Sequence, residues 1–77
     1  MRCNVHGPLN DYICARVKGR RLALNISQKK LADALGISYQ QLQKYENGKN
    51  RISAAKLWIV AHELGVDVSW FYPQARQ

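Results

Sequence analysis

The chain has 77 residues, 47% of them hydrophobic, which allows one small domain with a core only just sufficient for folding and argues against a disordered tail. Twelve Lys and Arg residues against five Asp and Glu residues give a net charge of +7, which favours a polyanionic partner. A basic, solvated surface would have the same charge, so a motif must decide between these two interpretations.

The chain begins with a segment that has no helical periodicity. Residues 1–8 end in Gly-Pro, and we expect them to form a flexible N-terminal arm. Asn10 or Asp11 can then cap a first helix that runs to about Leu24. One stripe of this helix carries Ile13, Val17, Arg21 and Leu24.

Residues 28–45 contain two short helical patterns joined by a tight turn. Ser27 can cap the second helix of the chain and Ser38 the third. Gly36 can take a positive φ between them, and Ala32 is small where two helices would cross closely. The apolar positions with helical spacing are Leu31, Leu35, Leu42 and Tyr45. This pattern predicts a helix-turn-helix, the unit that presents its second helix to the DNA major groove.

The rest of the chain predicts two more helices. The third helix ends at Asn47-Gly48, and Ser53 can cap a fourth whose core face is Leu57, Val60 or Ala61, and Leu64. Gly65 stops this helix, and Asp67 can cap a last short one that contains Val68, Trp70, Phe71 and Tyr72. We therefore expect an all-α, compact five-helix domain over residues 9–73, followed by a tail at 74–77.

Three sequence blocks together resemble a known family. They read ISQKKLADALGIS, YENGKNRIS and LWIVAHELGVDVSWF, and they lie within residues 17–71. In this order they resemble the Cro and phage-repressor type of helix-turn-helix regulators, the xenobiotic-response-element (XRE) family. The resemblance implies a repressor-like domain that binds operator DNA in the major groove as a homodimer.

The third helix has two unlike faces. Leu42, Tyr45 and Glu46 share one side, and the amides and cation on the other side suit base-edge readout. We expect the base-contacting residues to be Tyr39, Gln40, Gln43 and Lys44. The resemblance implies base contacts at the positions of Tyr39, Gln40 and Lys44. An ordinary solvated face is the alternative interpretation.

Phosphate contacts are expected on either side of the third helix. Gln28 opens the second helix, where backbone N–H groups favour an anion. The other candidates follow the third helix in a basic loop, and they are Asn47, Lys49, Asn50 and Arg51. Several phage members of the family carry Gln at the position of Tyr39, and there it forms a hydrogen bond with the Gln that opens the second helix. Here the Tyr39 hydroxyl could reach a phosphate or Gln28, or its ring could contact a thymine methyl.

Arg21 and Glu46 are candidates for a structural ion pair. Arg21 lies on the apolar stripe of the first helix, where an unpaired charge is costly, and Glu46 lies on the core side of the third. Similar proteins pair residues at these two positions. The pair would join the first helix to the recognition helix.

The sequence argues against catalysis, cofactors and metal sites. It has no nucleophile–base–orienter set and no glycine-rich phosphate loop. Cys3 and Cys14 have neither disulfide-framework nor zinc-site spacing, and His6 and His62 are isolated. There is no signal-peptide region and no apolar run of membrane-spanning length, so we expect a cytoplasmic protein without a membrane partner.

The C-terminal aromatic residues predict the assembly. Trp58, Trp70 and Phe71 supply more aromatic area than one small core needs, so we expect them at a homodimer interface. The favoured function is sequence-specific regulation of transcription. We expect the protein to bind double-stranded DNA and to act as a repressor. The alternative is a protein-interaction module with a protein partner, such as the antitoxin of a toxin–antitoxin pair. Few residues follow Leu64, so we expect no effector domain.

Overall fold

Serine hydroxyls and left-handed glycines set most of the helix boundaries. In the computed structural model, which describes residues 7–73, these boundaries delimit four α-helices and one 3₁₀-helix. They are α1 (Pro8–Ala23), α2 (Gln28–Leu35), α3 (Tyr39–Glu46), α4 (Ala54–Leu64) and the 3₁₀-helix η1 (Val68–Phe71). The fold is all-α as predicted, but the last of the five expected helices is a single 3₁₀ turn.

The three predicted serine caps are confirmed. Each hydroxyl oxygen accepts a hydrogen bond from the backbone N–H three residues later, which satisfies one of the free donors of the helix start. The bonds are Lys30 N to Ser27 Oγ at 3.0 Å, Gln41 N to Ser38 Oγ at 3.1 Å, and Lys56 N to Ser53 Oγ at 3.1 Å. At the other ends, Gly36 and Gly65 take φ values of 70° and 69° and stop α2 and α4 as expected.

The start of the first helix was predicted wrongly. α1 begins at Pro8 rather than after Asn10 or Asp11, because proline fits the first helical position, where no N–H bond is lost. Asp11 therefore lies in the first turn, where it is buried. Pro8 belongs to this helix and not to the expected arm, whose residues 1–6 lie outside the described residues, as does the tail at 74–77.

Two further expectations at helix ends need correction. Leu24 is the C-cap residue of α1 and is exposed, so the apolar stripe ends before it. Asp67 occupies the N-cap position of η1, but its side chain makes no capping bond there. Its Oδ2 accepts instead from the Ser69 hydroxyl at 2.7 Å. This short link stays within the turn.

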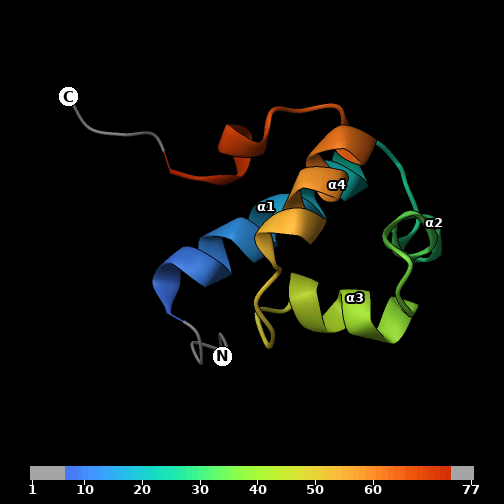
Figure 1. Cartoon of the computed structure of the whole chain (residues 1–77), viewed down its shortest axis with the longest axis horizontal. Coiled ribbons are helices and arrows are strands. Elements are labelled where there is room, and N and C mark those ends of the chain that lie inside the picture. The colour runs from blue at the N-terminus through green and yellow to red at the C-terminus, as the bar shows by residue number, and fades with distance from the viewer. Residues whose placement is uncertain (1–6, 74–77) are drawn as a thin grey trace.

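The core lies between α1, α4 and the α2–α3 unit. In Figure 1, α1 and α4 occupy the middle of the molecule, α3 lies along the lower edge, and η1 lies on the opposite side. The α4 core face includes both alternatives left open by the sequence, since Leu57, Val60, Ala61 and Leu64 are all buried. α3 therefore lies at one edge of the fold, with its apolar face against the core.

Between residues 7 and 73, no helix combines the length and apolar character needed to cross a bilayer.

Candidate nucleic-acid interface

α3 presents a polar face to solvent and an apolar face to the core. The four expected base-contacting residues are all exposed, namely Tyr39, Gln40, Gln43 and Lys44. On the opposite face, Leu42, Tyr45 and Glu46 are buried. α3 therefore has the exposed polar face and the buried apolar face that its sequence predicted. The first turn of α3 is accessible to a ligand.

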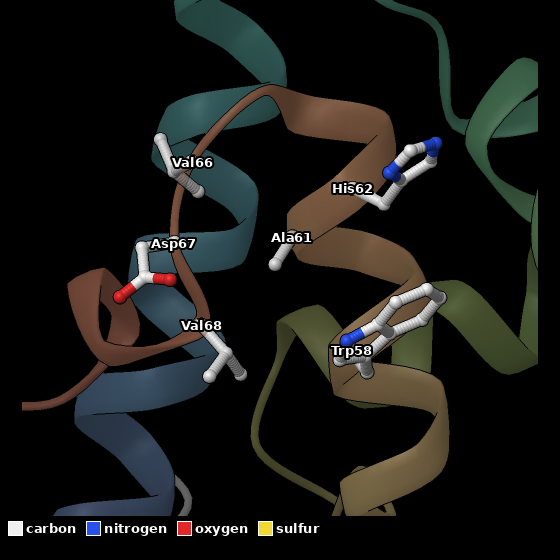
Figure 2. Close-up of a pocket in the computed structure, with 6 residues that line it drawn as sticks. All are labelled: Trp58, Ala61, His62, Val66, Asp67 and Val68. Carbon is white, nitrogen blue, oxygen red and sulfur yellow. The ribbon is translucent and has the colours of Figure 1, made fainter.

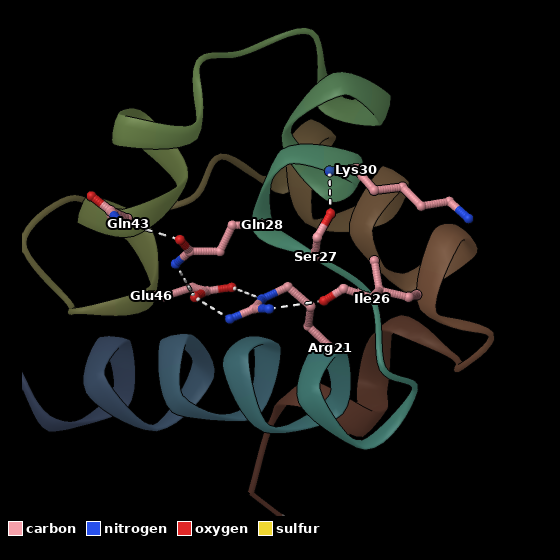
Figure 3. A network of polar contacts seen from close by, with 7 residues as sticks. All are labelled: Arg21, Ile26, Ser27, Gln28, Lys30, Gln43 and Glu46. Atoms are coloured by element: carbon pink, nitrogen blue, oxygen red, sulfur yellow. Dashed lines mark hydrogen bonds and ion pairs between the residues drawn. The ribbon is translucent and has the colours of Figure 1, made fainter.

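The predicted ion pair ties α1 to the back of α3. Arg21 Nε donates to Glu46 Oε2 at 2.7 Å, and Arg21 Nη2 donates to Glu46 Oε1 at 3.1 Å. Arg21 Nη1 also donates to the backbone oxygen of Ile26 at 2.8 Å. Because both side chains are buried, these bonds replace the water that each charge has lost. Figure 3 shows the pair in the space between α1 and α3.

Gln28 extends this network to the exposed face of α3. Its Nε2 donates to Glu46 Oε1 at 3.0 Å, and its Oε1 accepts from Gln43 Nε2 at 3.3 Å (Figure 3). Of the alternatives for Tyr39, a bond between its hydroxyl and Gln28 is not formed, and the ring is 48% exposed. The Gln28–Gln43 contact was missed, although Gln43 lies one helical turn after Tyr39 on the same face.

The expected phosphate loop after α3 is held by a second amide. Gln41 Nε2 donates to Asn50 Oδ1 at 3.1 Å, and Asn50 Nδ2 donates to the Lys49 carbonyl at 3.1 Å. Asn50 is therefore partly buried and fixes the loop, whereas Asn47, Lys49 and Arg51 are exposed. The role of Gln41 was not predicted from the sequence. Its position between the polar and apolar faces of α3 could have indicated a contact with the loop that follows.

A comparison with known families adds to this geometry. A family model described as helix-turn-helix matches residues 17–71, which include all of α2 and α3. The chain belongs to this helix-turn-helix family, of the XRE type. The likeness covers the range over which the sequence resembled the Cro and phage-repressor proteins, so that prediction is confirmed.

Relatives of this helix-turn-helix chain are named as regulators. An uncharacterised transcriptional regulator in the ATPase CF(0) region of Rhodospirillum rubrum is 46% identical over 64 residues, which are 83% of this chain and 59% of the relative. The chain spans about half the length of the curated relatives it matches, for example 49% of an HTH-type regulator from Sinorhizobium medicae. These relatives thus contain chain beyond the matched part.

Solved structures share the fold. The clp gene regulator ClgR from Corynebacterium glutamicum matches with a TM-score of 0.80 and 26% identity, covering 83% of this chain and 68% of that one. Hydroxypropylphosphonic acid epoxidase from S. wedmorenis matches with a TM-score of 0.79 and 25% identity, covering 88% of this chain and 36% of the enzyme. The same helical unit therefore occurs in regulators and in part of an enzyme, so fold alone does not assign function.

The aromatic residues of this helix-turn-helix domain differ in exposure. Phe71 is 0% exposed, so its prediction as an interface residue is corrected: its ring fills the core. Trp70 is partly buried, with the Arg16 guanidinium 3.6 Å from its ring centroid and Arg16 Nη2 donating to its carbonyl at 2.9 Å. Trp58 is 63% exposed, and it is the member of this group that remains available to a partner.

A shallow pocket of about 150 Å³ lies beside Trp58. Trp58 and His62 stack on α4 with ring centroids 5.8 Å apart. Figure 2 shows these two rings on one side of Ala61 and the segment after α4 on the other, where Val66, Asp67 and Val68 complete the lining. This mostly apolar hollow is on the α4 and η1 side of the molecule.

Cys14 lies beneath the loop that follows α3. Its thiol is buried, with Sγ 4.0 Å from the Asn50 carbonyl oxygen. Burial raises the pKa of this thiol from 9.0 to about 11; the Asp11 and Glu46 charges add to the rise, and a hydrogen bond with the Gly48 backbone opposes it. Such a thiol is unreactive near neutral pH. Within residues 7–73, no three or more His, Cys, Asp or Glu side chains are grouped to hold a metal ion.

Proposed function

We propose that this chain binds a specific operator by placing α3 in the DNA major groove, and that it acts there as a repressor in homodimeric form. One observation carries the proposal. The polar face of α3 is exposed while its other face is anchored by the core and by the Arg21–Glu46 pair. A helix supported in this way can enter a groove without losing its position.

The exposed residues suit the division between base and phosphate contacts. The Gln40 amide can pair with adenine N6 and N7, and the Lys44 ammonium can reach guanine O6 or N7. Tyr39 lies in the first turn, where its hydroxyl can reach a phosphate or its ring a thymine methyl. Gln28 at the start of α2 and the loop residues Asn47, Lys49, Asn50 and Arg51 are proposed to hold phosphates.

Repression would follow from occupancy of the operator. A single domain of this size covers only a few base pairs, whereas a two-fold pair doubles the contacts and fits a palindromic site. The exposed Trp58 beside the pocket supports a protein contact on the face formed by α4 and η1. The names of the relatives favour regulation over the antitoxin alternative.

Selection of bound duplexes from a random pool tests the function directly. A single enriched motif is expected, and Gln40→Ala should relax preference at one base position at a cost of about 1–3 kcal/mol on the best site. Glu63→Ala, an exposed change on α4, serves as the matched control and should leave the motif unchanged. An unenriched pool together with capture of a tight protein partner would reject DNA recognition and favour the interaction module.

A further inference from the structure

The polar network behind α3 runs without interruption from a buried charge to an exposed amide. Arg21 donates two hydrogen bonds to the Glu46 carboxylate. Glu46 accepts a third from Gln28, and Gln28 accepts one from Gln43. The four residues of this network come from three helices, with Arg21 on α1, Gln28 on α2, and both Gln43 and Glu46 on α3. Gln43 is the last member, and its side chain is exposed on the proposed recognition face.

The chemistry of the network fixes which way each amide points. A carboxylate paired with arginine only accepts hydrogen bonds, so the Gln28 nitrogen must face Glu46. The Gln28 oxygen then faces Gln43, and Gln43 must turn its nitrogen inward to donate to it. The carbonyl oxygen of Gln43 is left pointing away from the network, as Figure 3 shows.

Reversing this polarity would cost a hydrogen bond whichever of the two amides rotates. If Gln43 alone rotated its amide by 180°, its oxygen would face the Gln28 oxygen at the present 3.3 Å separation. If Gln28 rotated as well, its oxygen would face the Glu46 carboxylate at the present 3.0 Å. Because Arg21 holds that carboxylate in a buried place, the repulsion would not be relieved by water.

We propose that Gln28 is a positioning residue for base recognition, which transmits the acceptor character of Glu46 to Gln43. Gln43 then presents a carbonyl oxygen to base edges that donate, namely adenine N6 or cytosine N4. Guanine and thymine offer only acceptors in the major groove and are disfavoured at this position. This inference rests on the proposed entry of α3 into the groove, and it assigns Gln28 a role in specificity beyond a phosphate contact.

Substitutions at Gln28 can remove or reverse the transmitted polarity. Gln28→Leu cannot donate or accept, so the Gln43 amide becomes free to rotate. Gln28→Lys only donates, and it can donate to both Glu46 and Gln43. Gln43 would then turn its oxygen inward and present its nitrogen to the DNA, while the ammonium keeps Glu46 paired.

The experiment measures the affinities of four operators that differ at one base pair. Gln43→Ala first identifies that position, as the one where preference is lost. There, the wild-type protein should favour adenine or cytosine by about fivefold or more, the lower range for a well-placed amide contact. Gln28→Leu should bring the ratio close to one, and Gln28→Lys should shift it by about fivefold or more towards guanine or thymine.

Three results would overturn the inference. They are a wild-type preference for guanine or thymine at the Gln43 position, no position affected by Gln43→Ala, and Gln28 variants that weaken all four operators equally. The last result would mark Gln28 as a phosphate or stability residue alone. In the Gln43→Ala background, neither Gln28 variant should change the base ratio. A wild-type protein without any preferred sequence would instead reject the proposed function itself.

Discussion

Arg21 and Glu46 stabilise each other at a place where neither is tolerated alone. Glu46→Ala leaves the buried Arg21 guanidinium without an opposite charge. We expect this substitution to lower the free energy of unfolding by about 3–5 kcal/mol. Urea unfolding measures this change. The exposed Lys29–Asp33 pair, with 3.5 Å between Nζ and Oδ2, gives a matched control, and Asp33→Ala should change stability by less than about 0.5 kcal/mol. Equal effects of the two substitutions would show that burial of the first pair is energetically unimportant.

The raised pKa of Cys14 predicts a stability loss in alkali. Below pH 9 the thiol is protonated in both states, so its burial contributes fully to stability. Between pH 9 and about 11 the unfolded chain loses the proton first, and stability should fall by at most about 1.4 kcal/mol per pH unit. Urea unfolding of the wild-type protein and Cys14→Ala across this window measures the difference, which removes contributions from other groups. Parallel pH profiles for the two proteins would contradict the prediction.

Individual side-chain partners were predictable only where one geometry was possible. The Arg21–Glu46 pair followed from two charges on apolar faces, because a buried charge must find an opposite one. The Gln28–Gln43 contact did not follow, because the sequence of α3 offers three glutamines, Gln40, Gln41 and Gln43, and each side chain has several rotatable bonds. Which of these contacts forms depends on how α2 and α3 pack against each other, and only the structure gives this.

Two glycines in different backbone conformations provide a test at the level of the helices. Gly19 lies in the exposed part of α1, and a Cβ there would meet nothing within 4 Å, so Gly19→Ala should stabilise the fold by about 0.5–1 kcal/mol. Gly36 is equally unobstructed but has a φ of 70°, so Gly36→Ala should destabilise it by about 1–2 kcal/mol. Thermal unfolding measures both. Changes of the same sign would show that helix propensity and turn strain do not govern these sites.

The helix boundaries were predictable where a cap acts locally. Ser27, Ser38 and Ser53 bond to backbone only three residues away, so neighbouring sequence was sufficient to place them. The α1 start was misplaced because proline competes with Asn10 and Asp11 as a start signal. The 3₁₀ form of η1 also escaped prediction, since a four-residue turn has too few residues for a periodic pattern.

For the whole molecule, the net charge of +7 predicts a salt-dependent affinity for DNA. The logarithm of the affinity should fall linearly with the logarithm of the salt concentration. Arg51→Ala, in the exposed loop after α3, should weaken all sequences similarly and lower the slope by about one. Lys18→Ala removes the same charge from the exposed side of α1 and should leave the slope unchanged. A slope that responds equally to both changes would indicate diffuse attraction and no defined phosphate contact.

Assembly into a homodimer depends on whether the exposed face beside α4 is self-complementary. Trp58 is 63% exposed and borders the pocket, whereas Trp70 is held against the fold by Arg16. Trp58→Ala should therefore weaken dimers with little change in the melting temperature, while Trp70→Ala should lower the melting temperature first. Sedimentation of the free protein and of its DNA complex measures assembly. Two recognition helices about 34 Å apart would give half-sites centred about ten base pairs apart. A complex that stays at one protein per selected operator under saturating protein would rule out the dimer.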